Sequence, residues 1–262
     1  NAAIALAGGG VLEAADNQVE AGGGPAIAVA AFADAVDGFV DRNTIAAPGS
    51  HGVRVAGVTS GRVAGNRITD AGGHGVLLDA AAGVLVSGND IARVVFAGIR
   101  ARGSRDLTAR DNVVAESPDG GINLEADGAV EVRGNDVRNS GDSGVAIVAS
   151  AAGSTALFVD NVVRTSEVDG IFATGSDAVT VTGNDVDNSG QTGINLPAVR
   201  GAAIAGNDVR FSAQDAIRVT GGGRIAAAGN RLADSLGSGI LVEADAGVAF
   251  ELDVRGNEIV RQ

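Results

Sequence analysis

The chain has 262 residues, of which 45% are hydrophobic and 41 are glycine, and its formal net charge of −13 excludes the basic footprint of a nucleic-acid-binding protein. It contains no cysteine, which excludes disulfides, thiolate metal sites and a cysteine nucleophile. It also lacks a run of about eighteen apolar residues, so we expect no membrane span.

An asparagine followed two residues later by Ile, Val or Leu recurs from residue 17 to the end of the chain. Most steps are 23 residues, and the exceptions are 26, 26 and 27. The positions are Asn17, Asn43, Asn66, Asn89, Asn112, Asn135, Asn161, Asn184, Asn207, Asn230 and Asn257. A period of this length is typical of a solenoid, in which each repeat forms one coil.

A small residue followed by Ile or Val recurs nine residues after each asparagine from Asn17 to Asn230. All variation in repeat length falls in the other part of the coil, after Ala26, Gly144 and Gly239. We therefore expect one corner of the coil to be sterically fixed and the opposite corner to accept insertions.

Apolar residues alternate within each repeat. In one repeat they are Val76 and Leu78, then Val84 and Val86, then Ile91. Period two in such short pieces predicts three short strands per coil, with turns at the intervening Gly, Asn, Asp and Ser. The sequence thus predicts an all-β parallel β-helix of about 11 coils of 23 residues, as a single domain over residues 1–262.

The asparagines are expected to stack at one bend. A side-chain amide can donate and accept along the solenoid axis, and asparagine tolerates left-handed backbone. The predicted structural ladder comprises Asn66, Asn89, Asn112, Asn135, Asn161, Asn184, Asn207 and Asn230.

A leucine-rich repeat is the competing fold, because Val84-x-Val86-x-x-Asn89-x-Ile91 fits its core pattern. The leucine expected three residues before Val84 is Ala81, however, and the return segment alternates instead of following a helical period. These departures favour the β-helix.

The repeat resembles that of the right-handed parallel β-helix proteins of the pectate-lyase-like superfamily, including mannuronan C5-epimerases and periplasmic copper-site maturation proteins. The resemblance covers Ala3 to Val260. It implies an extracellular, cell-surface or periplasmic protein that binds or acts on carbohydrate. It does not imply one activity, because this fold carries lyases, hydrolases, epimerases and inert scaffolds.

Two histidines, His51 and His74, lie 23 residues apart and are expected to stack on consecutive coils. One interpretation makes them, with Arg100, the catalytic residues of a groove, with a histidine as general base. The other treats the position before the small residue as an exposed, freely varied site. A metal pair would also need a further ligand nearby.

Charged residues form a column at Asp79, Arg102 and Glu125 on three successive coils. Ion pairs between neighbouring strands would stabilise the sheet modestly. The functional interpretation is a substrate-binding surface, in which Arg102 and Arg54 neutralise a uronate carboxylate beside Asp79 and Glu125.

Our first functional hypothesis is a non-catalytic module that acts as a rigid scaffold or binds a polysaccharide or a surface protein. The resemblance implies that lyases and epimerases of this fold use Lys, Arg, Tyr or His as base and acid, and the chain has no Lys or Tyr. The alternative is a polysaccharide lyase or C5-epimerase acting on uronate-containing glycans.

We expect no cofactor, with calcium left open for an acidic column that includes Asp90, Asp136 and Asp185. No capping helix is expected at either end of the solenoid. Bare terminal coils expose strand edges, which predicts end-to-end association, neighbouring domains or a partner there.

Overall fold

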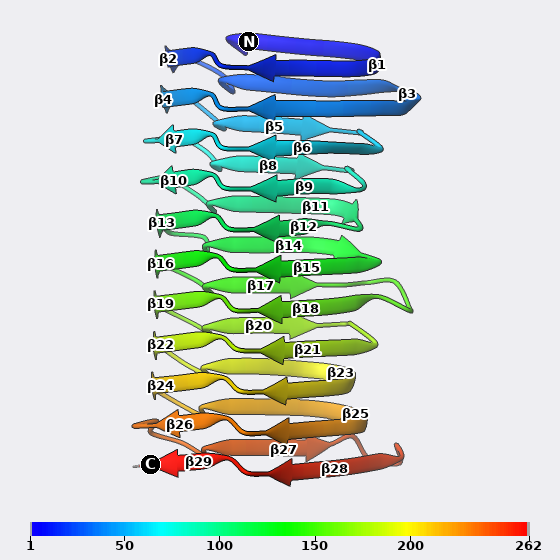
Figure 1. Cartoon of the computed structure of the whole chain (residues 1–262), viewed down its shortest axis with the longest axis vertical. Helices are drawn as coiled ribbons and strands as arrows, with labels where there is room; N and C mark the ends of the chain where they lie inside the picture. Colours follow the sequence, from blue (N-terminus) through cyan, green and yellow to red (C-terminus); the bar gives the residue numbers. More distant parts are fainter. Residues whose placement is uncertain (1, 261–262) are drawn as a thin grey trace.

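The computed structural model describes residues 2–260, which form twenty-nine β-strands and no helix. The chain winds through eleven coils stacked along one axis, and its two ends lie at opposite ends of the stack (Figure 1). Each coil contributes to three faces. The predicted all-β parallel β-helix is confirmed.

Face 1 contains β5 (Val53–Ala56), β8 (Val76–Asp79), β11 (Ile99–Arg105), β14 (Ile122–Asp127), β17 (Val145–Val148), β20 (Ile171–Thr174) and β27 (Ile240–Ala244). Face 2 contains β6 (Ser60–Ala64), β9 (Val84–Ser87), β12 (Thr108–Arg110), β15 (Ala129–Arg133), β18 (Thr155–Val159), β21 (Ala178–Thr182) and β28 (Phe250–Arg255). Four long strands continue from face 1 into face 2, namely β1 (Ile4–Ala15), β3 (Ile27–Asp41), β23 (Ile194–Ala205) and β25 (Ile217–Ala228).

Face 3 is a separate parallel sheet of eleven strands. These are β2 (Gln18–Gly22), β4 (Thr44–Pro48), β7 (Arg67–Thr69), β10 (Asp90–Ala92), β13 (Val113–Ser117), β16 (Asp136–Ser140), β19 (Val162–Ser166), β22 (Asp185–Ser189), β24 (Asp208–Ser212), β26 (Arg231–Ala233) and β29 (Glu258–Val260).

Strands of successive coils pair in parallel and keep the repeat register. Asp90 of β10 lies opposite Val113 of β13, and Ile91 lies opposite Val114. Ile91 and Val114 are fully buried, whereas Asp90 is exposed. The period-two pattern therefore sends every second side chain into the core, where aliphatic residues stack on aliphatic residues.

The asparagine ladder forms as predicted. Asn112 donates from its backbone N–H and from its Nδ2 to Oδ1 of Asn135, at 3.0 and 2.9 Å. Asn135 repeats both bonds to Asn161, at 3.1 and 2.9 Å. These side chains are at most 1% exposed, so the ladder satisfies polar groups that water does not reach.

Left-handed backbone falls on the residue before the ladder asparagine and not on the asparagine itself. Asp111, Gly134 and Asp160 have φ values of 55°, 61° and 52°. The tolerance of asparagine for this conformation is thus not used by the ladder residues at these sites. Glycine and aspartate adopt the turn, and the asparagine supplies the hydrogen bonds.

The corner between faces 3 and 1 is sterically fixed, as predicted. A Cβ atom added to Gly98 would lie 2.2 Å from Cγ1 of Val114 and 2.8 Å from the Gly121 carbonyl oxygen. The corner between faces 1 and 2 carries the insertions. They lie in the long strand β3 and in the loops that join β17 to β18 and β27 to β28 (Figure 1).

Inward-facing side chains of the last coil are partly uncovered, because no further coil packs on them within residues 2–260. Leu252, Val254 and Ile259 are 47%, 46% and 49% exposed.

Candidate functional site

His51 and His74 stack on consecutive coils at the fixed corner, with ring centroids 5.3 Å apart and planes inclined by 12°. The His74 backbone N–H donates to Nδ1 of His51, and the Ala97 N–H donates to Nδ1 of His74, each at 3.1 Å. His74 is only 5% exposed. The expectation that this position is exposed is therefore wrong at His74, because the next coil covers it.

Aspartates fill the same position on later coils and accept the equivalent hydrogen bond. Oδ1 of Asp169 accepts the Thr192 N–H at 3.0 Å, and Oδ1 of Asp215 accepts the Ser238 N–H at 2.7 Å. Where this position holds His or Asp, the side chain thus accepts a backbone N–H from the next coil. The histidines perform this structural task through Nδ1.

The environment keeps both imidazoles neutral near pH 7. Burial, followed by the proximity of the His51 ring and of the Arg102 and Arg100 guanidinium groups, lowers the pKa of His74 to about 4. Burial, with the charges of Arg54 and Arg102, also lowers the pKa of His51. Because Nδ1 accepts a hydrogen bond in each ring, the proton resides on Nε2. Each neutral ring therefore offers a donor and no free basic nitrogen.

The predicted arginines lie on face 1, and two of them are paired. Arg54 Nη2 lies 2.9 Å from Oδ2 of Asp79, and Arg100 Nη2 lies 3.0 Å from Oε2 of Glu125. Arg102 lies opposite Asp79 in the sheet register, as the column predicted. The ion pairs nevertheless form diagonally. The Arg102 guanidinium makes no hydrogen bond or ion pair with the described residues 2–260.

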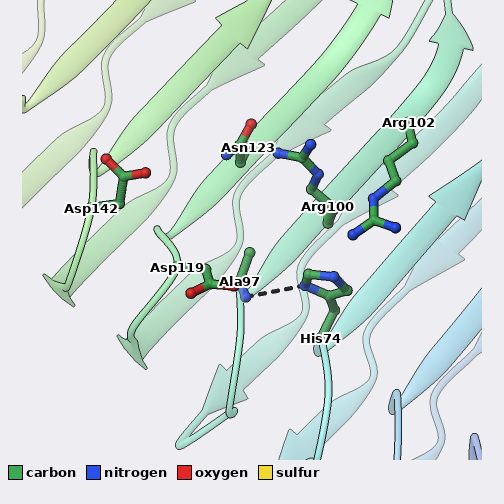
Figure 2. A pocket seen from close by; sticks show the side chains of 7 residues that line it. All are labelled: His74, Ala97, Arg100, Arg102, Asp119, Asn123 and Asp142. Carbon is green, nitrogen blue, oxygen red and sulfur yellow. Dashed lines mark hydrogen bonds between the residues drawn. The ribbon is translucent and has the colours of Figure 1, made fainter.

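A cavity of about 260 Å³ opens beside these residues. Figure 2 shows the Arg102 guanidinium pointing toward His74, Arg100 pointing toward Asn123, and two carboxylates on the other side. Its lining comprises His74, Ala97, Arg100, Arg102, Asp119, Asn123 and Asp142.

A second cavity of about 250 Å³ continues along the solenoid axis and shares Asn123 and Asp142 with the first. It adds Ala146, Asp169 and Phe172, among others. We call the two adjoining cavities, from His74 to Phe172, the furrow. It runs from the turn before β8 across β11, β14, β17 and β20 on face 1, beside the fixed corner.

Asp169 is the most enclosed carboxylate of the furrow, at 3% exposure. Burial raises the pKa of its carboxyl, and hydrogen bonds from Asn195 Nδ2 at 2.8 Å and from the Thr192 N–H oppose the rise. Sequence reasoning did not select Asp169, although it occupies the position of His51 and His74. It also missed Asp119, Asn123 and Asp142, and Asn123 continues the column of Arg100.

Metal-binding geometry is absent from the described part of the chain. No group of three or more His, Cys, Asp or Glu side chains in residues 2–260 is arranged to hold a metal ion. In the acidic column on face 3, Asp185 is paired with Arg164 at 3.2 Å and with Arg210 at 2.6 Å. Nor do residues 2–260 contain a helix able to cross a membrane.

The stacked coils and the axial furrow define a parallel β-helix protein with a surface cleft. The family model described as "Right handed beta helix region" matches residues 2–161. The model described as "Periplasmic copper-binding protein (NosD)" matches residues 92–259. Each match covers more than half of the chain, so the chain belongs to these right-handed β-helix families.

Solved structures show the same fold at low identity. The Azotobacter vinelandii mannuronan C-5 epimerase AlgE6 A-module is 13% identical with a TM-score of 0.59, over 96% of this chain and 91% of that one. A DFA-IIIase from Arthrobacter chlorophenolicus A6 without its lid is 16% identical with a TM-score of 0.50, over 90% and 70%. No curated protein sequence matches the chain.

The residues present do not fit the copper ion that the NosD family name implies. Copper(I) sites use cysteine and methionine, of which the chain has none, and imidazole is the main nitrogen ligand of copper in proteins. Its two histidines use Nδ1 to accept backbone N–H groups, and their Nε2 atoms carry protons. A copper ion would have to break one of these hydrogen bonds or remove an Nε2 proton.

Proposed function

We propose that this protein is a non-catalytic, glycan-binding β-helix module of the periplasm or the cell exterior, and that the furrow is its binding surface. The observation that carries the proposal is the Arg102 guanidinium, which has no ion-pair partner among residues 2–260 and lies at the edge of a polar cleft that follows the solenoid axis. A guanidinium with free donors is a strong group for an acidic or hydroxyl-rich ligand.

The shape and chemistry of the furrow suit a carbohydrate. Hydrogen-bond donors line one end and carboxylate acceptors the other, and Phe172 supplies an aromatic side chain against which a sugar ring can pack. The NosD family name supports the periplasm, and the epimerase and the DFA-IIIase are carbohydrate-active relatives in fold.

The state of the histidines supports a non-catalytic role. A general base works best when its pKa lies near the working pH. The pKa of His74 is lowered to about 4, and its Nδ1 lone pair is engaged by Ala97. His74 therefore serves the furrow as an Nε2–H donor.

The test measures the binding of acidic and neutral polysaccharides by calorimetry and then analyses the same mixtures for reaction products. We expect saturable binding, no rise in absorbance at 235 nm and no new reducing ends. Arg102→Ala should weaken binding about tenfold or more, because hydrogen bonds to charged groups contribute about 1.5–3 kcal/mol. Arg93→Ala, which removes an arginine paired with Asp70 away from the furrow, should leave binding unchanged. Equal losses in both variants would contradict the proposal.

A lyase or C5-epimerase is the second candidate, favoured by the position of His74 next to Arg100 and Arg102 in one cavity. Unsaturated product, or solvent deuterium incorporated at C5 of a uronate, would establish it. Such activity should disappear in His74→Ala; activity that survives would rule out the assignment of His74 as the base.

A further inference from the structure

Charge is distributed unevenly along the furrow. At the β8–β11 end, Glu125 neutralises Arg100, and Arg102 stays unpaired among residues 2–260. This end therefore presents one guanidinium that has no ion-pair partner within residues 2–260. Figure 2 shows that its guanidinium lies on the side of the cavity opposite to Asp119 and Asp142.

The β17–β20 end has the opposite character. Within residues 2–260 its lining contains the carboxylates of Asp142 and Asp169, the ring of Phe172 and no arginine. The chain has no lysine to supply another cation. An anionic group placed here would meet these two carboxylates. Arg218, whose charge acts on Asp169, is itself paired with Glu243 at 2.9 Å.

We infer that the furrow binds a heteroglycan in which one acidic sugar is followed by uncharged sugars, with the acidic group on Arg102 and the uncharged part running toward Phe172. This inference rests on the proposed function and names its ligand class. It excludes glycans that carry a carboxylate on every sugar.

The spacing of the two ends fits this arrangement. Arg100, Asn123, Ala146 and Phe172 occupy one column on consecutive coils. Three strand spacings separate Arg100 from Phe172, a distance of about 14 Å along the solenoid axis. A short oligosaccharide laid along the axis therefore meets the arginine end with one sugar and the aromatic end with another. A uniformly acidic oligosaccharide of that length would direct a carboxylate toward Asp142 or Asp169.

The whole molecule reinforces this selection. With a formal net charge of −13, the protein repels polyanions at long range. Binding of a multiply charged glycan would then need several local cations, and the furrow offers only one that is unpaired in the described chain. A ligand with isolated charges avoids this conflict.

The experiment compares three classes of glycan by isothermal titration and affinity electrophoresis. Glucuronoxylan, xanthan and gellan carry acidic sugars separated by neutral ones, alginate and polygalacturonate are acidic throughout, and pullulan and curdlan are neutral. We expect at least one glycan of the first class to bind tenfold or more tightly than every member of the other two. Arg102→Ala should reduce that affinity about tenfold, toward the level of the neutral class.

The carboxylates provide an independent test through a gain of binding. Asp119→Asn and Asp142→Asn should each strengthen binding of polygalacturonate, because removing one like charge at about 4 Å in water changes an affinity about fivefold. Both side chains are exposed, so these variants should fold normally. Asp90→Asn on face 3 is the control, since it changes the net charge equally but lies outside the furrow.

The outcomes separate the inference from the proposed function. Tightest binding of alginate, polygalacturonate or a neutral glycan would overturn the inference and retain a glycan-binding protein. An equal gain in Asp90→Asn and Asp142→Asn would also overturn it, because net charge alone would then explain selectivity. Failure of all three classes to bind would overturn the proposed function as well.

Discussion

Replacing Asn135 with alanine removes one rung of the asparagine ladder and leaves its neighbours without partners. Both the backbone N–H and Nδ2 of Asn112 lose their acceptor, which lies 3.0 and 2.9 Å away. The carbonyl oxygens of Ala109 and Arg133 lose a donor at 3.0 Å each. Asn112 is 0% exposed, so water does not replace these bonds.

The expected loss follows from the stranded donors. A buried polar group left without a partner costs about 1–3 kcal/mol, so two donors predict a loss of about 2–6 kcal/mol in the free energy of unfolding. The lost side-chain volume adds to this, because the interior does not close completely around a truncated residue.

Urea unfolding followed by circular dichroism measures this loss. The matched control is Asn123→Ala, the same substitution at a half-buried asparagine of the furrow outside the ladder. We expect the control to stay within about 0.5 kcal/mol of the unsubstituted protein. If Asn135→Ala destabilised the protein by less than about 1 kcal/mol, or by no more than the control, the ladder would not stabilise the fold by satisfying buried polar groups.

Three further predictions concern the fixed corner and the histidines. Gly121→Ala should destabilise the protein by about 1–3 kcal/mol in thermal unfolding, because the new Cβ would lie 2.1 Å from Cγ1 of Val137. Gly23→Ala, with no atom within 4 Å, should be neutral. Since the folded-state pKa of His74 is lowered to about 4, its neutral form stabilises the fold above pH 6.5, and up to about 3 kcal/mol is lost as pH falls toward 4. Urea unfolding at several pH values in this range should show a smaller loss of unfolding free energy for His74→Gln than for the unsubstituted protein. An identical pH dependence of the unfolding free energy in both proteins would refute the lowered pKa of His74. Calorimetric titration with copper ions should give the same weak heats for the native protein and for the double variant His51→Gln/His74→Gln. A tight copper site present only in the native protein would contradict the conclusion that its residues do not fit copper.

The fold follows closely from the sequence because solenoid residues interact mainly with their counterparts one period away. Recurrence of Asn135 and Asn161 in the sequence is therefore also contact in space. The sterically fixed corner at Gly98 was readable for the same reason, since invariant spacing reflects close packing. The sequence did not show that the left-handed residue is the one before the asparagine, because the repeat pattern does not report φ.

The site was only partly predictable. Alternation identified Arg100 and Arg102 as outward residues. It did not show that Glu125, which shares a column with Arg102, pairs with Arg100 instead. Diagonal pairing depends on side-chain reach and not on register. Nor did the sequence show that His74 is buried, because an outward position at a tight corner can be covered by the next coil.

The central claim is that the furrow between Arg102 and Phe172 holds a glycan. A crystal structure of the protein with a tightly bound oligosaccharide from the heteroglycan class tests it most directly. We predict density for the sugars along the furrow, with the acidic group on the Arg102 guanidinium. Sugar density confined to face 2 or face 3 would contradict the claim.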